Sequence, residues 1–204
     1  MMRLLVDSDV FCKLGVGDLL NDALAVFGTS VSDCGRLPAL PHMLRKGKLV
    51  KVYGAEACAS LVPIAAEMQP LPAPDTTWLD RLTSVQSIDP GEALLFAIAA
   101  QNSLSLITGD KRALRALKDV NGYAAALAGR IIVLEAILLS LCDRLGHAEV
   151  RRRLGPLTKN DKTLMICFSE SEPDPRSILE MYYRSLASEV HPLRLWEPHT
   201  GGTA

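Results

Sequence analysis

The sequence predicts a three-layer α/β/α fold, in which helices cover both faces of a central parallel sheet, with a mostly helical C-terminal extension. Short apolar runs of strand length alternate with longer helix-forming stretches through residues 1–145, and this alternation is typical of doubly wound parallel sheets. Two of the runs end in acidic residues, as expected where parallel strands open onto a binding site. The chain is 49% hydrophobic and 22% charged, a normal composition for a folded globular domain.

The strands are predicted from short runs of apolar residues bounded by polar or turn-forming residues. Residues 3–6, 103–107 and 130–134 are the clearest of these runs, and the last is β-branched. Residues 49–53 and 164–168 are candidates for two further short strands.

The helices are predicted from helix-forming residues with recurring apolar positions. The expected ranges are residues 10–27, 55–68, 79–82, 93–100, 111–118, 135–145 and 178–190. The segment 93–100 is apolar on all sides, so this helix is expected to be buried. Residues 28–41 are rich in Gly, Ser and Pro and predict a loop, and the prolines at 70–74 predict a connection.

One domain is expected over residues 1–145, followed by an accessory segment at 146–204 whose tail, 200–204, is expected to be disordered. The formal net charge of −1 provides no global positive field for nucleic acid, so any such binding has to be local. The five cysteines are scattered without a C-x-x-C pair, which argues against zinc or a disulfide framework. We expect no export signal and no membrane span, and therefore a cytoplasmic protein.

Acidic residues follow two of the predicted strands. Asp7 and Asp9 come directly after residues 3–6, and Asp110 follows residues 103–107 in the segment Leu-Ile-Thr-Gly-Asp. Because ligands bind beyond the carboxyl ends of parallel strands, we expect these acids at one site, where a cation would offset their repulsion. Asp is also a favoured helix N-cap, and this alternative stays open for each position.

A further acid, Glu92, opens the apolar helix in the segment Asp-Pro-Gly-Glu at residues 89–92. The same four residues fit a capping box, with Asp89 as the N-cap and Glu92 as the third helical residue. Residues 93–100 contain no other charged side chain. Glu92 is therefore the one polar group of a buried element, which favours a role in the site.

The order of these acids resembles the PIN-domain nuclease family, in which an acid ends the first strand, a second acid lies on a middle helix and a third follows a later strand. The match covers about residues 3–135 and includes Thr108 at the end of the later strand. The resemblance implies that Asp7, Glu92 and Asp110 are the catalytic residues and coordinate Mg²⁺ or Mn²⁺, with Asp9 as an outer ligand or cap. It also implies that the metal activates water for phosphodiester hydrolysis.

The chain departs from the family pattern at two places. The family usually has another Glu between the first and middle acids, and the candidates here, Glu56 and Glu67, come late in the interval. The family often has one more acid or Asn soon after the last, where this chain has Lys111 and Arg112. Glu135, after the predicted strand at 130–134, is a candidate replacement.

Phosphate contacts are expected from local basic runs. Lys111, Arg112 and Arg115 are favoured because they follow Asp110 closely, and the runs at 45–51 and 151–153 are further candidates. The expected partner is single-stranded or structured RNA, with DNA less favoured, in a toxin-like or RNA-processing role. A protein partner such as an antitoxin, and a homo-oligomer, also agree with the resemblance.

Two other functions stay open. A PIN-like protein that binds nucleic acid or acts as a scaffold without catalysis agrees with the missing intermediate Glu. The Asp-x-Asp pair of Asp7 and Asp9 also resembles the first motif of haloacid-dehalogenase-type phosphatases, with Asp7 as nucleophile and Asp9 as general acid. That family needs a later second acid, where this chain has Ala113 and Leu114.

Overall fold

A computed structural model describes residues 2–159, 161–169 and 174–198 of the chain. Within these residues a five-stranded parallel sheet has the order β3-β2-β1-β4-β5, with β1 at its centre. The strands are β1 (Leu4–Val6), β2 (Cys34–Arg36), β3 (Gln69–Pro70), β4 (Ser105–Thr108) and β5 (Ile131–Val133). This confirms the predicted α/β class with a central parallel sheet.

The helices alternate with these strands along the chain. In the described part of the chain they are α1 (Ser8–Val16), α2 (Leu20–Val26), α3 (Leu40–Met43), α4 (Lys48–Tyr53), α5 (Ala55–Glu67), α6 (Thr76–Asp80), α7 (Pro90–Asn102), α8 (Lys111–Leu117), α9 (Tyr123–Ala126), α10 (Leu134–Leu145), α11 (His147–Leu154), α12 (Lys162–Cys167) and α13 (Pro175–Glu189), with 3₁₀ turns η1 (Val31–Asp33) and η2 (Gly155–Leu157).

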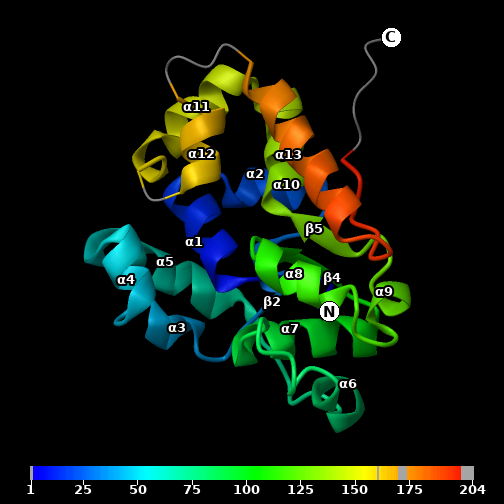
Figure 1. Cartoon of the computed structure of the whole chain (residues 1–204). Coiled ribbons are helices and arrows are strands. Elements are labelled where there is room, and N and C mark those ends of the chain that lie inside the picture. The colour runs from blue at the N-terminus through cyan, green and yellow to red at the C-terminus, as the bar shows by residue number, and fades with distance from the viewer. Residues whose placement is uncertain (1, 160, 170–173, 199–204) are drawn as a thin grey trace.

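Alternate residues of the strands supply two cores on opposite faces of the sheet. In β1, Leu4 and Val6 belong to one buried cluster with residues of α1, α2, α5 and α10. Leu5 belongs to a second cluster with residues of α7 and α8. Successive strand residues point to opposite faces, and Figure 1 shows α2 and α10 on one side of the sheet and α6 and α7 on the other. Helices therefore flank the sheet on both faces.

The C-terminal segment is mostly helical, as predicted, and packs on both cores. Leu164 and Phe168 of the α12 region and Leu179 of α13 are buried in the first cluster, whereas Leu186 is buried in the second. The domain boundary expected at residue 145 stays a prediction, and the tail at 200–204 lies outside the described residues. Among the described helices none is long and apolar enough to cross a membrane.

Two predicted strands were wrong, because both segments are helices. In α4, Leu49 is buried and Tyr53 is half-buried four residues later, while Lys51 between them is exposed; an alternating strand would have placed all three on one face. In α12, Leu164 and Cys167 are buried and the Asp161 carboxylate caps the helix by accepting a hydrogen bond from the Leu164 amide. The helical spacing of buried positions decides both cases.

The predicted helix at 10–27 is two helices, because the chain turns between α1 and α2, where Asp18 has a positive φ of 50°. The predicted loop at 28–41 contains the short strand β2. Its Gly35 packs so closely on β1 that an added Cβ would lie 2.6 Å from the Leu5 side chain. A three-residue strand with a central Gly has almost no apolar pattern, which explains why it was missed.

Candidate functional site

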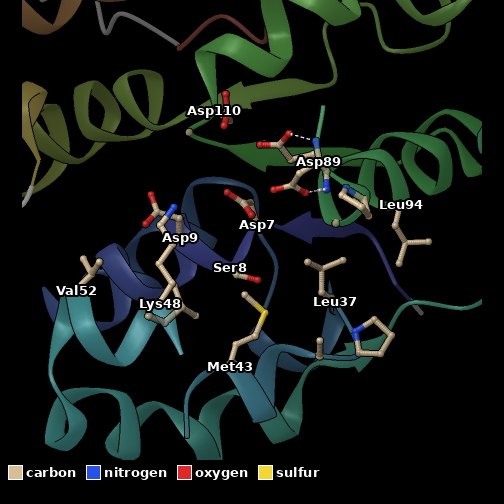
Figure 2. Close-up of a pocket in the computed structure, with 17 residues that line it drawn as sticks. Asp7, Ser8, Asp9, Leu37, Met43, Lys48, Val52, Asp89, Leu94 and Asp110 are labelled. Carbon is tan, nitrogen blue, oxygen red and sulfur yellow. Dashed lines mark hydrogen bonds between the residues drawn. The ribbon is translucent and has the colours of Figure 1, made fainter. Parts of the chain in front are cut away.

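The main pocket of the described residues lies at the carboxyl ends of β1 and β4, beside the N-terminus of α7. Its volume is about 840 Å³. Figure 2 shows the side chains of Asp7, Asp89 and Asp110 on one side of this pocket and those of Met43 and Leu37 on the opposite side. The lining residues are Asp7, Ser8, Asp9, Leu37, Pro38, Ala39, Met43, Lys48, Leu49, Val52, Asp89, Pro90, Gly91, Glu92, Leu94, Gly109 and Asp110.

Asp7 is the N-cap residue of α1, but its side chain makes no capping hydrogen bond. Burial is the main cause that raises the pKa of its carboxyl to about 7, and the charge of Asp9 adds to it. The Ser8 amide partly offsets the shift, while Asp89 and Asp110 raise the pKa further. Asp7 therefore lies in a setting that disfavours additional negative charge.

Glu92 and Asp89 form the capping box that the sequence suggested. The Asp89 amide donates to Glu92 Oε2 at 2.8 Å, and the Glu92 amide donates to Asp89 Oδ1 at 2.8 Å. Burial, followed by a side-chain hydrogen bond to Asp110, raises the pKa of Glu92 to about 8. The Glu92 carboxyl therefore both caps α7 and lines the pocket.

Asp110 likewise combines two roles. It lines the pocket, and its Oδ1 accepts a hydrogen bond of 2.8 Å from the Ala113 amide at the start of α8. Burial acts to raise the pKa of Asp110, but the side-chain hydrogen bond from Glu92, the Ala113 amide and the Arg112 charge outweigh it, so the pKa is lowered. The pKa values of Glu92 and Asp110 are thus shifted in opposite directions, with that of Glu92 raised and that of Asp110 lowered.

Asp9 lines the same pocket but already has partners. Tyr53 donates a hydrogen bond of 2.5 Å to Asp9 Oδ1, and Lys13 Nζ lies 2.7 Å from Asp9 Oδ2. Lys13 also lies 2.6 Å from Asp161, the N-cap of α12. Both carboxylate oxygens of Asp9 therefore already have partners within the protein.

Thr108 and Glu135 were further candidates. Thr108 is buried, and its Oγ1 accepts a hydrogen bond of 3.3 Å from the Asp110 amide, which orients the turn that carries Asp110. Glu135 is not among the pocket residues. Its buried carboxylate lies 2.5 Å from Lys111 Nζ. The structure thus gives Glu135 a partner outside the acidic pocket.

The three predicted nucleic-acid-binding residues lie in different surroundings. Arg112 is exposed and 3.7 Å from Asp110. Lys111 pairs with Glu135, and Arg115 pairs with Glu189 at 2.5 Å. Among the three, Arg112 is the one next to the pocket whose guanidinium faces solvent.

Three polar or charged pocket residues were absent from the predicted site: Ser8, Lys48 and Asp89. Asp89 was interpreted as a cap alone, although its position three residues before Glu92 was a usable signal. Lys48 belongs to a basic run that was considered for phosphate contacts, but the strand expected at 49–53 gave no indication that Lys48 begins helix α4 at the pocket. Figure 2 shows the Lys48 side chain extending from α4 toward Asp9. Ser8 lies between two acids in the sequence, and no sequence feature indicated that it lines the pocket.

The donor chemistry of the pocket fits a hard divalent cation, because carboxylate oxygens from the ends of β1 and β4 and from α7 line one pocket. A bound cation would also favour the ionised forms of Asp7 and Glu92 and so lower their raised pKa values. Within the described ranges, however, no three His, Cys, Asp or Glu side chains are already arranged to hold a metal. The acids are gathered, but ligation requires some side-chain rearrangement.

No protein-family model matches the chain, and no significant similarity to a curated protein or a solved structure is found. The fold itself, a parallel sheet of order β3-β2-β1-β4-β5 with helices on both faces, is compatible with a PIN-like protein.

Proposed function

We propose that the protein is a divalent-metal-dependent nuclease of the PIN-like type that hydrolyses phosphodiester bonds of RNA. The observation that carries the proposal is the convergence of Asp7, Glu92 and Asp110 in one pocket at the carboxyl end of the sheet. They come from three distant segments of the chain, so helix capping alone does not account for their meeting.

Asp7, Glu92 and Asp110 would hold Mg²⁺ or Mn²⁺, with Asp9 as an outer group fixed by Lys13 and Tyr53. When bound, such an ion polarises a phosphoryl oxygen and lowers the pKa of coordinated water. The protein's own contribution is to concentrate carboxylates where burial makes their charge costly. Thr108 supports this by orienting the Asp110 turn.

Two basic side chains are suited to contact the phosphates of the substrate. Lys48 is exposed and is the only Lys or Arg among the described residues that line the pocket. Arg112 is exposed beside Asp110. Local cations of this kind supply the binding that a net charge of −1 does not.

The test is cleavage of a labelled single-stranded RNA with Mn²⁺, with Mg²⁺ and with EDTA. Asp110→Asn is the main variant, because Asn is also a good N-cap and should preserve α8 while removing the charge. Asp119→Asn is the control, since Asp119 is an exposed acid outside the pocket. We expect cleavage only with metal, retained in the control and abolished in Asp110→Asn. Full activity in EDTA, or in Asp110→Asn, would reject the proposal.

A non-catalytic scaffold is the second candidate, and a specific observation favours it. Glu92 and Asp110 both accept hydrogen bonds at helix N-termini, and the described acids do not form a ready three-ligand cluster. A scaffold predicts nucleic-acid binding that is unchanged by Mn²⁺ and by Asp110→Asn. The nuclease proposal predicts a change in both cases.

A further inference from the structure

The hydroxyl of Ser8 is a buried polar group without a partner. Ser8 is 4% exposed, and its Oγ has no hydrogen-bond partner within the part of the chain that the structure describes. Buried hydroxyls are normally paired, because leaving one unpaired costs free energy. Ser8 also lines the main pocket. An unpaired group at such a place indicates that its partner belongs to a ligand.

The position of Ser8 divides the pocket into two chemically different parts. Figure 2 shows Ser8 between Asp7 on one side and the side chains of Met43 and Leu37 on the other. The acidic part contains Asp7, Asp89, Glu92 and Asp110. The opposite part contains the apolar side chains of Leu37 and Met43.

The chemical groups of a nucleotide, phosphate, sugar and base, match the order of the acidic part, Ser8 and the apolar part of the pocket. The phosphate suits the acidic part once a cation is present, and the base suits the apolar part. The sugar then lies between them, next to Ser8. The pocket of about 840 Å³ lies within the range of roughly 300–1,000 Å³ typical of sites for small organic ligands.

We infer that Ser8 Oγ hydrogen-bonds a ribose 2′-hydroxyl of the bound strand and makes the pocket selective for RNA over DNA. This inference rests on the proposed nuclease function. The 2′-hydroxyl both donates and accepts, and it is the group by which a protein distinguishes RNA from DNA at a given position. One neutral hydrogen bond contributes about 0.5–1.5 kcal/mol, or roughly two- to tenfold in affinity.

The experiment compares the binding of a labelled uridine hexamer with that of its 2′-deoxy counterpart, by fluorescence anisotropy with Ca²⁺, and in parallel their cleavage with Mn²⁺. The wild-type protein should bind the ribo-hexamer about two- to tenfold more tightly. Ser8→Ala should lose this preference by weakening ribo-hexamer binding alone, and Ser8→Thr should keep it. Thr29→Val is the matched control, because the Thr29 hydroxyl is also buried and unpaired among the described residues but lies outside the pocket.

Thermal melts separate a substrate contact from a structural role. Ser8→Ala removes an unpaired buried hydroxyl, so it should melt at or above the wild-type temperature. The inference is overturned if the wild type shows no ribose preference, if Ser8→Ala weakens both hexamers equally, or if neither hexamer binds. A Ser8-dependent ribose preference without any cleavage would support the inference and reject the catalytic function. If both hexamers are cleaved equally by the wild type and by Ser8→Ala, the nuclease function is supported and the role of Ser8 is rejected.

Discussion

The ammonium nitrogen of Lys111 lies 2.5 Å from the carboxylate of Glu135, whose side chain is 4% exposed. Lys111 also lies 5.2 Å from the centre of the Tyr182 ring and 3.4 Å from Thr163 Oγ1. Lys111 therefore links α8 to α10, α12 and α13. Two residues that the sequence suggested for the site are joined in a contact that holds the C-terminal helices to the α/β core.

Lys111→Ala should destabilise the protein by about 3–5 kcal/mol, because it leaves the buried Glu135 carboxylate without its cation. Urea unfolding at neutral pH measures this change. Lys118→Ala is the control, since Lys118 pairs with the exposed Asp119, and its loss should cost less than about 1 kcal/mol. The double variant Lys111→Met with Glu135→Leu should regain most of the loss. Equal stability of Lys111→Ala and wild type would contradict this structural role.

Lys48→Ala should weaken binding of single-stranded RNA and lower the slope of log K against log salt by about 0.7, the value for one phosphate contact on a single strand. Arg112→Ala should have a similar effect. Binding titrations at several salt concentrations measure the slope. Lys51→Ala is the comparison, because Lys51 is exposed on the same helix α4 but is not a pocket residue. A slope that falls equally in Lys51→Ala would place the binding face elsewhere.

Much of the fold could be predicted because the residues that form local apolar patterns in the sequence are the residues buried in the structure. Helix α7 begins at a capping box and is apolar over residues 93–100, and the centre of β4 is an apolar run ending before Asp110. The errors lie where the pattern is short. Residues 49–53 are too few to distinguish the apolar spacing of a helix from that of a strand, so only tertiary contacts decide between the two structures.

The acidic residues of the site could be predicted for a topological reason. Strands β1 and β4 are neighbours in parallel register, so Asp7 and Asp110 emerge at the same edge of the sheet. The apolar wall was not predictable in this way. It is formed by residues such as Leu37 and Met43 from α3 and the segment before it, whose position depends on packing rather than on a motif.

Asp7→Asn should make the metal-free protein less sensitive to pH. Burial raises the folded pKa of Asp7 to about 7 from an ordinary value of 3.8, so its protonated form favours folding. That stability is fully present below about pH 4 and is lost as pH rises toward 7. Thermal melts in EDTA between pH 4 and 8 should show a smaller decline for Asp7→Asn. The loss of stability that remains in Asp7→Asn should extend to about pH 8, because Glu92, whose pKa is also raised, likewise favours folding in its protonated form.

A capping role for Asp7 makes the opposite prediction at neutral pH. If its side chain stabilised α1, Asp7→Asn should change stability by the same amount at every pH, and Asp7→Ala should cost about 0.5–2 kcal/mol. A variant that is as stable as, or more stable than, the wild type at pH 8 in EDTA supports the buried-acid account. A parallel shift of the whole pH curve to lower stability would reject it.

Binding of Mn²⁺, followed by the loss of its free electron paramagnetic resonance signal during titration, tests the central claim most directly. The nuclease account predicts one Mn²⁺ per wild-type chain and affinity that is lower by about tenfold or more in Asp7→Asn and Asp110→Asn. Asp119→Asn, the exposed acid outside the pocket, should bind Mn²⁺ as the wild type does. Absence of binding in the wild type, or equal affinity in all four proteins, would contradict a metal site at these carboxylates.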